Sequence, residues 1–242
     1  MKEVRYFYVP KASTTNELPE DEAAHAVRVL RLTEGDEVRL MDGEGTFYRA
    51  EIAEATKKRC TYRILEAMPQ QRQWAAHLHL AVAPTKNMDR MEWLAEKATE
   101  IGFDELTFLR CQFSERTVVK TERVEKIVVA AVKQSHKAWK PQLNDVTDFA
   151  QFVAQPFPGK KFICHCYKQD DMAAKVALKD VLVAGEDALV LVGPEGDFSV
   201  DEVRMAEQAG FVSVTLGMSR LRTETAALVA VHLMNLANTS SI

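Results

Sequence analysis

The sequence has few cysteines, and their spacing does not build a thiol-rich metal site. The four cysteines include no C-x-x-C pair; they are Cys60, Cys111, Cys164 and Cys166. His165 separates the last two in a strand-like run, so it points to the face opposite both. We interpret the cysteines as small core residues in a reducing compartment. His77 and His79 could share a strand face, but no carboxylate or cysteine motif accompanies them, and we expect no metal.

Long apolar runs and net positive charge are also missing. No stretch approaches the roughly 20 apolar residues of a membrane span. The N-terminal stretch MKEVRYFYVPKAS is interleaved with charge and lacks the apolar core of a signal peptide. We therefore expect a cytoplasmic protein that does not contact a membrane. The formal net charge of −4 argues against a strongly basic nucleic-acid binder, although a local basic patch would suffice for phosphate binding.

The motifs of the commonest α/β enzymes are absent as well. The chain contains no G-x-G-x-x-G after a strand, no G-x-x-x-x-G-K-[ST], no G-x-S-x-G and no H-E-x-x-H. These absences exclude the simplest dinucleotide-binding, P-loop, hydrolase and zinc-protease interpretations.

The first 70 residues have the sequence pattern of a small β domain. A helix is predicted over 19–30, and strands are predicted over 5–9, 36–41, 45–53 and 59–66. This pattern indicates a compact, mostly antiparallel barrel. The stretch Met68–Gln73 then changes composition and reads as a linker. We predict one domain over 1–70 and a second over 71–242.

Beyond the linker, strands alternate with helices. The predicted strands are 77–83, 106–109, 161–167, 188–192 and 212–216. The predicted helices are 87–101, 121–139, 172–182, one from Ser199 to Gly210, and one from Thr223 toward the C-terminus. Such alternation predicts a mostly parallel sheet with helices on both faces.

The stretch from Ala188 to Asn238 concentrates the signals of a ligand site. Gly193–Gly196, with the sequence GPEG, suits a type I turn after a buried strand. Ser199 and Glu202 have the capping-box spacing, with Phe198 and Val203 placed as its hydrophobic staple. Parallel sheets bind ligands at the carboxyl ends of their strands, so we expect chemistry at this stretch.

The same stretch resembles a known family. GPEG, followed by Leu216-Gly217 and by LRTETA over 221–226, resembles the RsmE family of 16S ribosomal RNA uridine N3-methyltransferases in the SPOUT superfamily. The resemblance extends to His25, Val29-Leu30-Arg31, Lys86, Arg90 and the KATEIG run over 97–102. Two departures stand out: Asp197 replaces a third glycine, and Lys137 lies where the family has Gly-Arg.

The resemblance implies the following fold and ligands. It implies a PUA-like β-barrel followed by a SPOUT-type α/β domain with a trefoil knot. It also implies a homodimer that binds S-adenosylmethionine as methyl donor and acts on 16S ribosomal RNA in the small subunit. The dimer has separate support, because the last helix is apolar around much of its circumference and must bury more than one face.

Two residue sets follow from this interpretation. The expected cofactor-binding set is Leu191, Gly193, Pro194, Glu195, Gly196, Leu216, Gly217, Leu221, Arg222 and Thr223. Arg222 is also the candidate catalytic residue, because a guanidinium can stabilise the uracil anion that forms when N3 loses its proton. A structural ion pair of Arg222 with Glu195 or Glu224 is the alternative. Thr223 is expected to cap the last helix.

A further set is expected to contact RNA phosphates: His25, Arg28, Arg31, Lys86, Arg90 and Arg116. A solvated helix face is the alternative for the first three. Three other functions stay open: a transfer-RNA methyltransferase, a non-catalytic RNA-binding ribosome assembly factor, and a small-molecule α/β enzyme.

Overall fold

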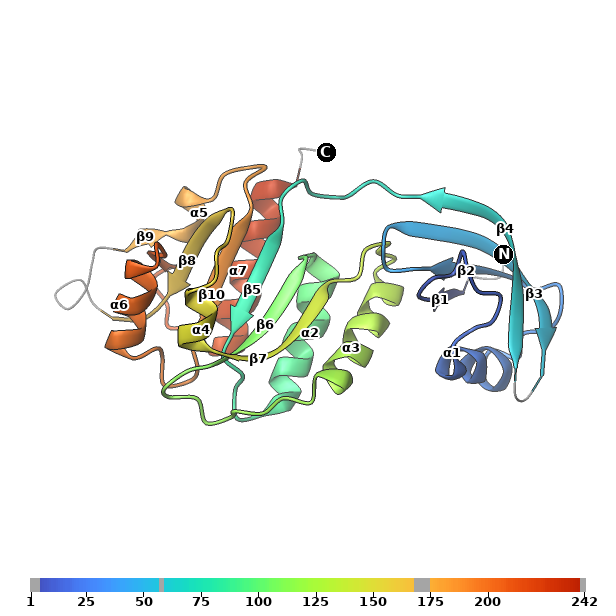
Figure 1. The fold of residues 1–242 in the computed structure, drawn as a ribbon, viewed down its shortest axis with the longest axis horizontal. Coiled ribbons are helices and arrows are strands. Elements are labelled where there is room, and N and C mark those ends of the chain that lie inside the picture. Colours follow the sequence, from blue (N-terminus) through green and yellow to red (C-terminus); the bar gives the residue numbers. More distant parts are fainter. Residues whose placement is uncertain (1–4, 57–58, 168–174, 240–242) are drawn as a thin grey trace. The chain divides into compact units, whose positions relative to one another are not determined.

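The chain forms two compact units. The computed structural model describes residues 5–56, 59–167 and 175–239. One unit comprises residues 1–72 with 129–140, and the other comprises residues 73–128 with 141–242. The first unit thus includes a segment that the predicted boundary at residue 70 does not assign to it. Figure 1 shows the elements of each unit.

The described part of the first unit is built on a four-stranded sheet. Its strands follow the order of the chain and are β1 (Tyr6–Tyr8), β2 (Glu37–Met41), β3 (Thr46–Ala55) and β4 (Cys60–Pro69). β1 pairs with β2 in parallel, and the other pairs are antiparallel. The inward side chains, among them Phe7, Leu40 and Ile52, form one buried core. All four predicted strands are confirmed.

The predicted helix over 19–30 has two parts. An α-helix, α1 (Glu20–Ala24), runs directly into a π-helical turn, η1 (His25–Val29). Arg31 follows with a left-handed φ of 54°. The periodicity predicted the helix correctly, but it did not indicate the wider turn.

The helix predicted over 121–139 ends earlier than expected. α3 covers Thr121–Gln134, and His136 takes a left-handed φ of 50°, which an α-helix cannot accommodate. In the first unit Trp139 packs against Gly45, whose φ is 110° and whose added Cβ would collide with the indole. We attribute the early end to this packing, which requires an irregular chain over 135–140.

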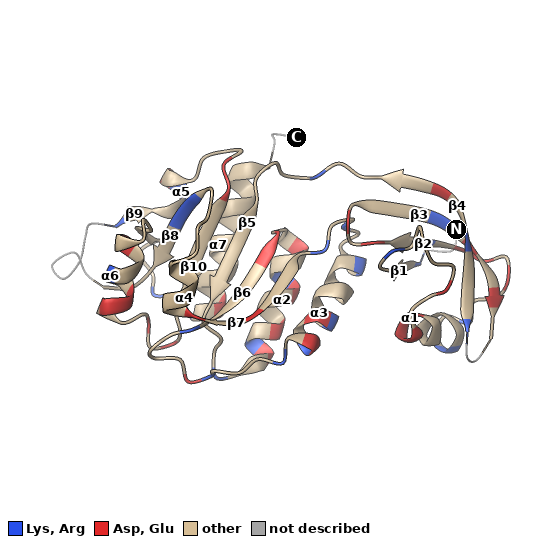
Figure 2. Cartoon of the chain, viewed as in Figure 1, with Lys and Arg blue, Asp and Glu red and all other residues tan. Residues whose placement is uncertain are grey.

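The second unit is a parallel α/β domain. Its described strands form one sheet in the order β7-β6-β5-β10-β8-β11-β9, and every pairing is parallel. The strands are β5 (Leu78–Val82), β6 (Glu105–Arg110), β7 (Gln142–Asp148), β8 (Lys160–Cys164), β9 (Val176–Ala177), β10 (Ala188–Val192) and β11 (Val212–Thr215). β5 and β10 lie at the centre, are fully buried and, as Figure 2 shows, carry no charged residue.

Helices pack against this sheet. They are α2 (Met88–Ile101), α4 (Phe149–Val153), α5 (Leu178–Val181), α6 (Val200–Gln208) and α7 (Thr223–Asn238). α7 packs on β5, β10, α2 and α5, whereas α4 packs on α6, β6 and β7. The predicted mostly parallel α/β architecture is confirmed.

Three elements of the second unit differ from the sequence prediction. β7 and α4 were not predicted, because β7 reads QLNDVTD and has no apolar alternation. The helix predicted over 172–182 begins outside the described residues. Its described part instead contains the short strand β9 and a single helical turn, α5. Among the helices of the described chain, none is long and apolar enough to cross a membrane.

Candidate functional site

The loop after β10 turns one residue later than predicted. The backbone N–H of Asp197 donates to the carbonyl oxygen of Pro194 at 2.9 Å, so the hydrogen-bonded turn covers Pro194–Asp197. The type I turn expected over Gly193–Gly196 is therefore wrong in register. Gly193 is buried at the strand end, while Glu195 and Gly196 are exposed at the tip.

Asp197 accounts for the register of this turn. Its φ of 67° lies in the left-handed region, which aspartate tolerates better than most residues. One carboxylate oxygen accepts from the backbone N–H of Phe198, and the other accepts from that of Cys166, both at 2.8 Å. The loops after β10 and β8 are thus joined by the residue that departs from the family pattern.

The helix after this loop begins as predicted. Ser199 Oγ accepts from the backbone N–H of Glu202 at 3.2 Å, and the Glu202 carboxylate accepts from that of Ser199 at 2.8 Å. Both residues are buried, and the second Glu202 oxygen accepts from the backbone N–H of Gln112 at 2.8 Å. The predicted capping box is confirmed, and it also holds the loop after β6.

The beginning of α7 differs from the prediction. Arg222, not Thr223, occupies the cap position, and its side chain makes no capping bond. Thr223 is the first helical residue; its buried hydroxyl donates to the carbonyl oxygen of Gly193 at 3.1 Å. The expectation that Thr223 caps the helix is therefore wrong. The hydroxyl instead ties the loop that follows β11 to the loop that follows β10.

Arg222 is exposed beside these loops. Within the described residues its guanidinium makes no ion pair with either of its two expected partners, Glu195 and Glu224. Glu195 accepts from the backbone N–H of Lys86 at 3.2 Å, and Glu224 pairs with Arg90 at 3.5 Å. The alternative of a structural ion pair with Glu195 or Glu224 is thus not formed, and the guanidinium faces solvent.

The expected cofactor-binding residues come from two loops and one strand end. Leu191 is buried in β10, Leu216 and Leu221 are half-buried, and Gly217 is exposed with a φ of 132°. A Cβ on Gly217 would meet nothing within 4 Å, so space is open beside its backbone. Gly193 is packed instead, since a Cβ there would lie 3.0 Å from the nitrogen of Phe198. Gly217 thus exposes its peptide group next to the half-buried Leu216.

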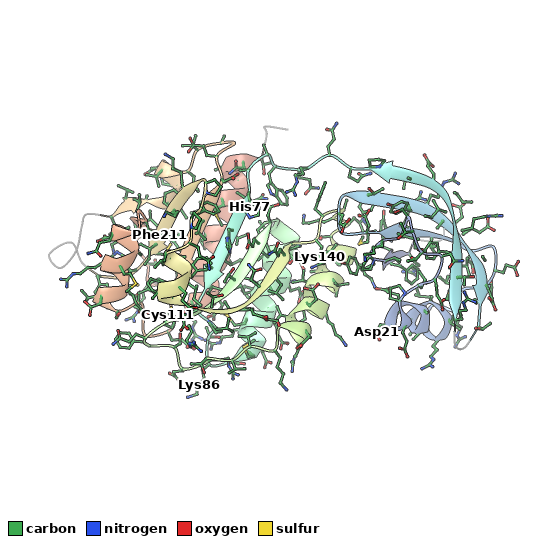
Figure 3. All side chains as sticks on the ribbon, in the orientation of Figure 1. Asp21, His77, Lys86, Cys111, Lys140 and Phe211 are labelled. Atoms are coloured by element: carbon green, nitrogen blue, oxygen red, sulfur yellow. The ribbon has the colours of Figure 1, made fainter. Side chains whose placement is uncertain are left out.

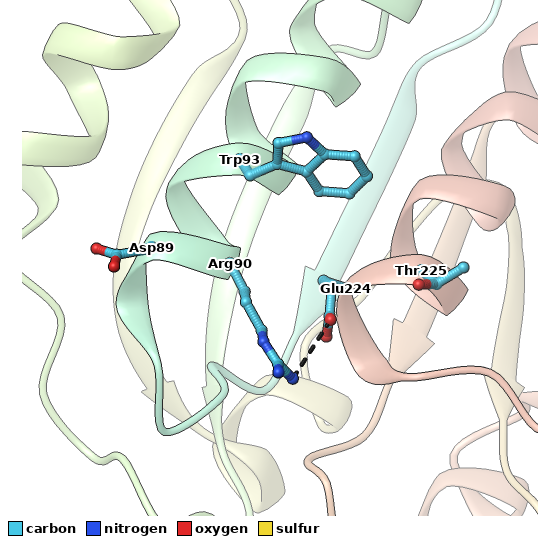
Figure 4. A pocket seen from close by; sticks show the side chains of 5 residues that line it. All are labelled: Asp89, Arg90, Trp93, Glu224 and Thr225. Carbon is cyan, nitrogen blue, oxygen red and sulfur yellow. Dashed lines mark ion pairs between the residues drawn. The ribbon is translucent and has the colours of Figure 1, made fainter.

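A shallow cleft of about 330 Å³ lies between α2 and α7, lined by Asp89, Arg90, Trp93, Glu224 and Thr225. Figure 4 shows Arg90 and Glu224 pointing toward each other across it, with the Trp93 ring above. The second Glu224 oxygen is buried and has no hydrogen-bond partner among the described residues. The sequence predicted Arg90 as an RNA phosphate contact, but no motif gave a signal for Trp93.

The expected RNA-contacting residues differ in the contacts that their side chains already make. His25, Arg28 and Arg31 are exposed in the first unit. In the second unit Lys86 is exposed and pairs with Glu115 at 3.1 Å. The Arg116 guanidinium donates twice to the carbonyl oxygen of Lys86, at 2.8 and 3.1 Å. Arg116 therefore has a structural role that the sequence did not indicate.

The cysteines do not act together. Cys60 and Cys111 are buried, as expected for core residues. Burial raises the pKa of the Cys164 thiol to about 12, which keeps it protonated and unreactive at neutral pH. Cys166 is exposed, so the interpretation of this residue as a core cysteine is wrong.

Comparison with known proteins assigns this chain to a family. The model of the RNA methyltransferase domain matches residues 72–235, and that of the RNA methyltransferase PUA domain matches residues 18–65. The chain belongs to this RNA methyltransferase family. The expected PUA-like module and SPOUT-type α/β domain are therefore confirmed.

Individual relatives agree over nearly the whole chain. Ribosomal RNA small subunit methyltransferase E of Bacillus subtilis is 31% identical over 87% of this chain and 85% of its own. A probable rRNA-methyltransferase from Porphyromonas gingivalis is 40% identical, with a TM-score of 0.90 over 97% of this chain and 98% of its own. A ribosomal RNA small subunit methyltransferase E from Neisseria gonorrhoeae, solved with bound S-adenosyl methionine, is 26% identical with a TM-score of 0.84 over the same shares.

Proposed function

We propose that this protein transfers the methyl group of S-adenosylmethionine to N3 of a uridine in 16S ribosomal RNA. It acts on the small ribosomal subunit in the cytoplasm. Family membership supports the reaction class. The single observation that carries the site is the hydrogen bond from Thr223 to Gly193, because it joins the loops after β10 and β11 beside open space.

The residues at these loops fit the methyl donor. Peptide groups at the exposed tip of the β10 loop can bind the polar parts of the cofactor, while Leu216 and Leu221 can flank its adenine. When bound, the cofactor supplies a methyl group on a positively charged sulfur, and no metal is needed for the transfer. The protein contributes orientation, which can lower such a barrier by several kcal/mol.

Arg222 is proposed to assist the nucleophile. Uracil N3 carries a proton at neutral pH and becomes nucleophilic when that proton leaves. A guanidinium that pairs with a neighbouring carbonyl oxygen stabilises the resulting anion. Arg222 is suited to this role because it is exposed beside the loops and is engaged by neither nearby glutamate.

The protein is further proposed to act as a homodimer. Leu236 on α7 is 61% exposed, and Trp93 on the adjoining α2 is 42% exposed. A second copy that covers these helices would bury both side chains. We also propose that the chain is threaded as a trefoil knot, as the family resemblance implies.

Binding of the donor is tested by calorimetry on the full-length protein with S-adenosylmethionine. One binding event per chain is expected. The absence of binding would favour a non-catalytic assembly factor and would contradict the proposed reaction.

The substrate is tested with a methyl-transfer assay on small ribosomal subunits, free 16S ribosomal RNA and transfer RNA, followed by nucleoside analysis. We expect 3-methyluridine in 16S ribosomal RNA, with subunits as the better substrate. Methylated transfer RNA instead would support the alternative substrate. Turnover that is insensitive to salt would contradict phosphate-driven RNA binding, which weakens steeply as salt rises.

The RNA-contacting role of His25, Arg28, Arg31, Lys86, Arg90 and Arg116 is also part of this proposal. Reversing Arg28 and Arg31 to glutamate should raise the apparent KM for RNA. It should also reduce the slope of log affinity against log salt by about 1 for each lost phosphate contact. An unchanged slope would identify this face as simply solvated.

A further inference from the structure

Three side chains of metal-ligand type meet at the amino ends of β5 and β6. They are His77, His79 and Glu105, and one ligand atom from each lies within 4.8 Å of the other two. His77 Nε2 is 2.8 Å from a Glu105 carboxylate oxygen, and His79 Nδ1 is 3.5 Å from the same oxygen. Ligand atoms about 2 Å from a tetrahedral zinc ion would be about 3.4 Å apart, so small shifts would satisfy this geometry.

The strand register explains why these residues meet. His77 and His79 are two residues apart along one extended segment and therefore lie on one face of the sheet. β5 and β6 are parallel, and their register places His79 directly opposite Glu105. The carboxylate that accompanies the histidine pair thus comes from the neighbouring strand, 26 residues beyond His79 by the numbering.

Outer partners orient these groups as they do around bound metals. Asn144 Nδ2 donates to the second Glu105 oxygen at 2.6 Å and to Thr107 Oγ1 at 2.8 Å. Thr107 Oγ1 in turn is 2.8 Å from His79 Nε2. With Nε2 held by the threonine, Nδ1 is the nitrogen left for the ion. Histidine ligands in metal sites characteristically have their other ring nitrogen held in this way.

We propose that His77, His79 and Glu105 bind a divalent transition-metal ion, for which Zn²⁺ is the best chemical match. Two imidazoles and one carboxylate are ligands that Zn²⁺ accepts readily, and they leave a fourth position for water. The His77 side chain is 40% exposed, which gives an ion and its water access from solvent.

The local charges favour a cation at this place. The Glu105 carboxylate hydrogen-bonds His77 Nε2 through one oxygen and Asn144 Nδ2 through the other. Asp104 and Asp187 add negative charge near His77. The Asp187 carboxylate also accepts from the His77 backbone N–H at 2.7 Å.

The metal site is separate from the proposed methyl-transfer site. Figure 3 shows His77 at the beginning of β5 and Lys86 beyond its opposite end. The glycine-bearing loops follow the carboxyl ends of β10 and β11, whereas the histidines and Glu105 lie at the amino ends of the strands. The ion therefore links β5 to β6 without touching the loops that carry Arg222.

The direct test is metal binding to the full-length protein after treatment with a chelator. Calorimetry with Zn²⁺ should show one saturable site per chain. Co²⁺ should give the visible absorption of a four-coordinate nitrogen–oxygen site, without a sulfur-to-cobalt charge-transfer band. A strong charge-transfer band would assign binding to Cys164 or Cys166 and would overturn the proposal, as would the absence of saturable binding.

Variants locate the site. His77→Ala and Glu105→Gln should each weaken Zn²⁺ binding more than Asn144→Ala, which removes an outer partner and should cost roughly 10- to 100-fold. His232→Ala, at an exposed histidine of α7, is the matched control and should bind like the unchanged protein. Circular dichroism and S-adenosylmethionine affinity check that each variant is folded. Undiminished Zn²⁺ binding in folded His77→Ala and Glu105→Gln would overturn the assignment.

Discussion

The candidate functional side chains at the two edges of the parallel sheet bond to different kinds of group. At the carboxyl edge, side chains bond to the backbone: Thr223 to Gly193, Asp197 to Cys166 and Phe198, and Glu202 to Gln112. At the amino edge, His77, His79, Glu105, Thr107 and Asn144 bond to one another. The first arrangement fixes loops and leaves peptide groups and Arg222 exposed, which suits recognition of a large ligand. The second concentrates titratable groups, which suits a small cation.

The largest expected effect is at the carboxyl edge. Arg222→Ala should lower turnover by roughly 100- to 1,000-fold, as removal of one stabilising donor typically does. S-adenosylmethionine affinity should stay within a few-fold, because the guanidinium is assigned to the uracil anion. Single-turnover methylation and calorimetry measure the two quantities. Arg220→Ala, at an exposed neighbour in the same loop, is the control, and full turnover in Arg222→Ala would remove this residue from catalysis.

The amino edge should respond to pH instead. The folded pKa of His79 is about 4, below the ordinary 6.5, so the unfolded chain binds more protons between these values. The free energy of unfolding should therefore fall as the pH drops from about 6.5 to 4, by at most about 3 kcal/mol from this residue. His79→Gln should flatten this decline in urea unfolding measured with a chelator present. Parallel curves for the two proteins would show that His79 is not the cause.

Thr223→Val tests the hydrogen bond that joins the loop after β11 to the loop after β10. The substitution keeps the shape of the side chain but leaves the buried Gly193 carbonyl without its hydroxyl donor, at a cost of about 1–3 kcal/mol. S-adenosylmethionine affinity should fall as well, because both loops contribute to the proposed site. Thr225→Val, at an exposed threonine one half-turn away, serves as the control. If Thr223→Val loses stability but binds the cofactor normally, the hydrogen bond between Thr223 and Gly193 has a structural role only.

The smallest effect concerns the backbone at Asp197. Asp197→Ala and Asp197→Gly both lose the bonds to Cys166 and Phe198, but only alanine must also hold a φ of 67°. The alanine variant should be less stable than the glycine variant by about 1–2 kcal/mol. Thermal unfolding of the pair checks this difference. Equal stabilities would mean that the loop relaxes out of the left-handed conformation.

Local signals in the sequence were sufficient for several elements. The apolar run 188–192 became β10 with the predicted bounds, and the Ser199–Glu202 spacing became a capping box. The helix predicted over 87–101 became α2, with Asn87 as its cap. In each case the determining interactions lie within a few residues, or depend only on burial of a continuous apolar segment.

The sequence did not predict the conformation correctly where it depends on contacts with distant parts of the chain. α3 ends at Gln134 rather than near Trp139, because the following residues pack in the first unit against Gly45. β7 has a polar sequence and becomes a strand only because β6 offers an edge to pair with. Threonine is a common helix-capping residue, but the Thr223 hydroxyl instead donates to the carbonyl oxygen of Gly193, 30 positions away.

The sequence by itself determined the alternation of strands and helices and the family of the chain. It also concentrated the expected ligand site between Leu191 and Thr223, because strand burial, capping and the GPEG and LRTETA motifs are local properties. Only the tertiary structure showed that Glu105 lies beside His77 and His79. It also showed that Glu195 and Glu224 bond to groups other than Arg222. The hydrogen bond from Thr223 to Gly193 is the third feature that only the tertiary structure showed. These three outcomes depend on the register of parallel strands and on competition among partners far apart in the chain, which no local pattern encodes.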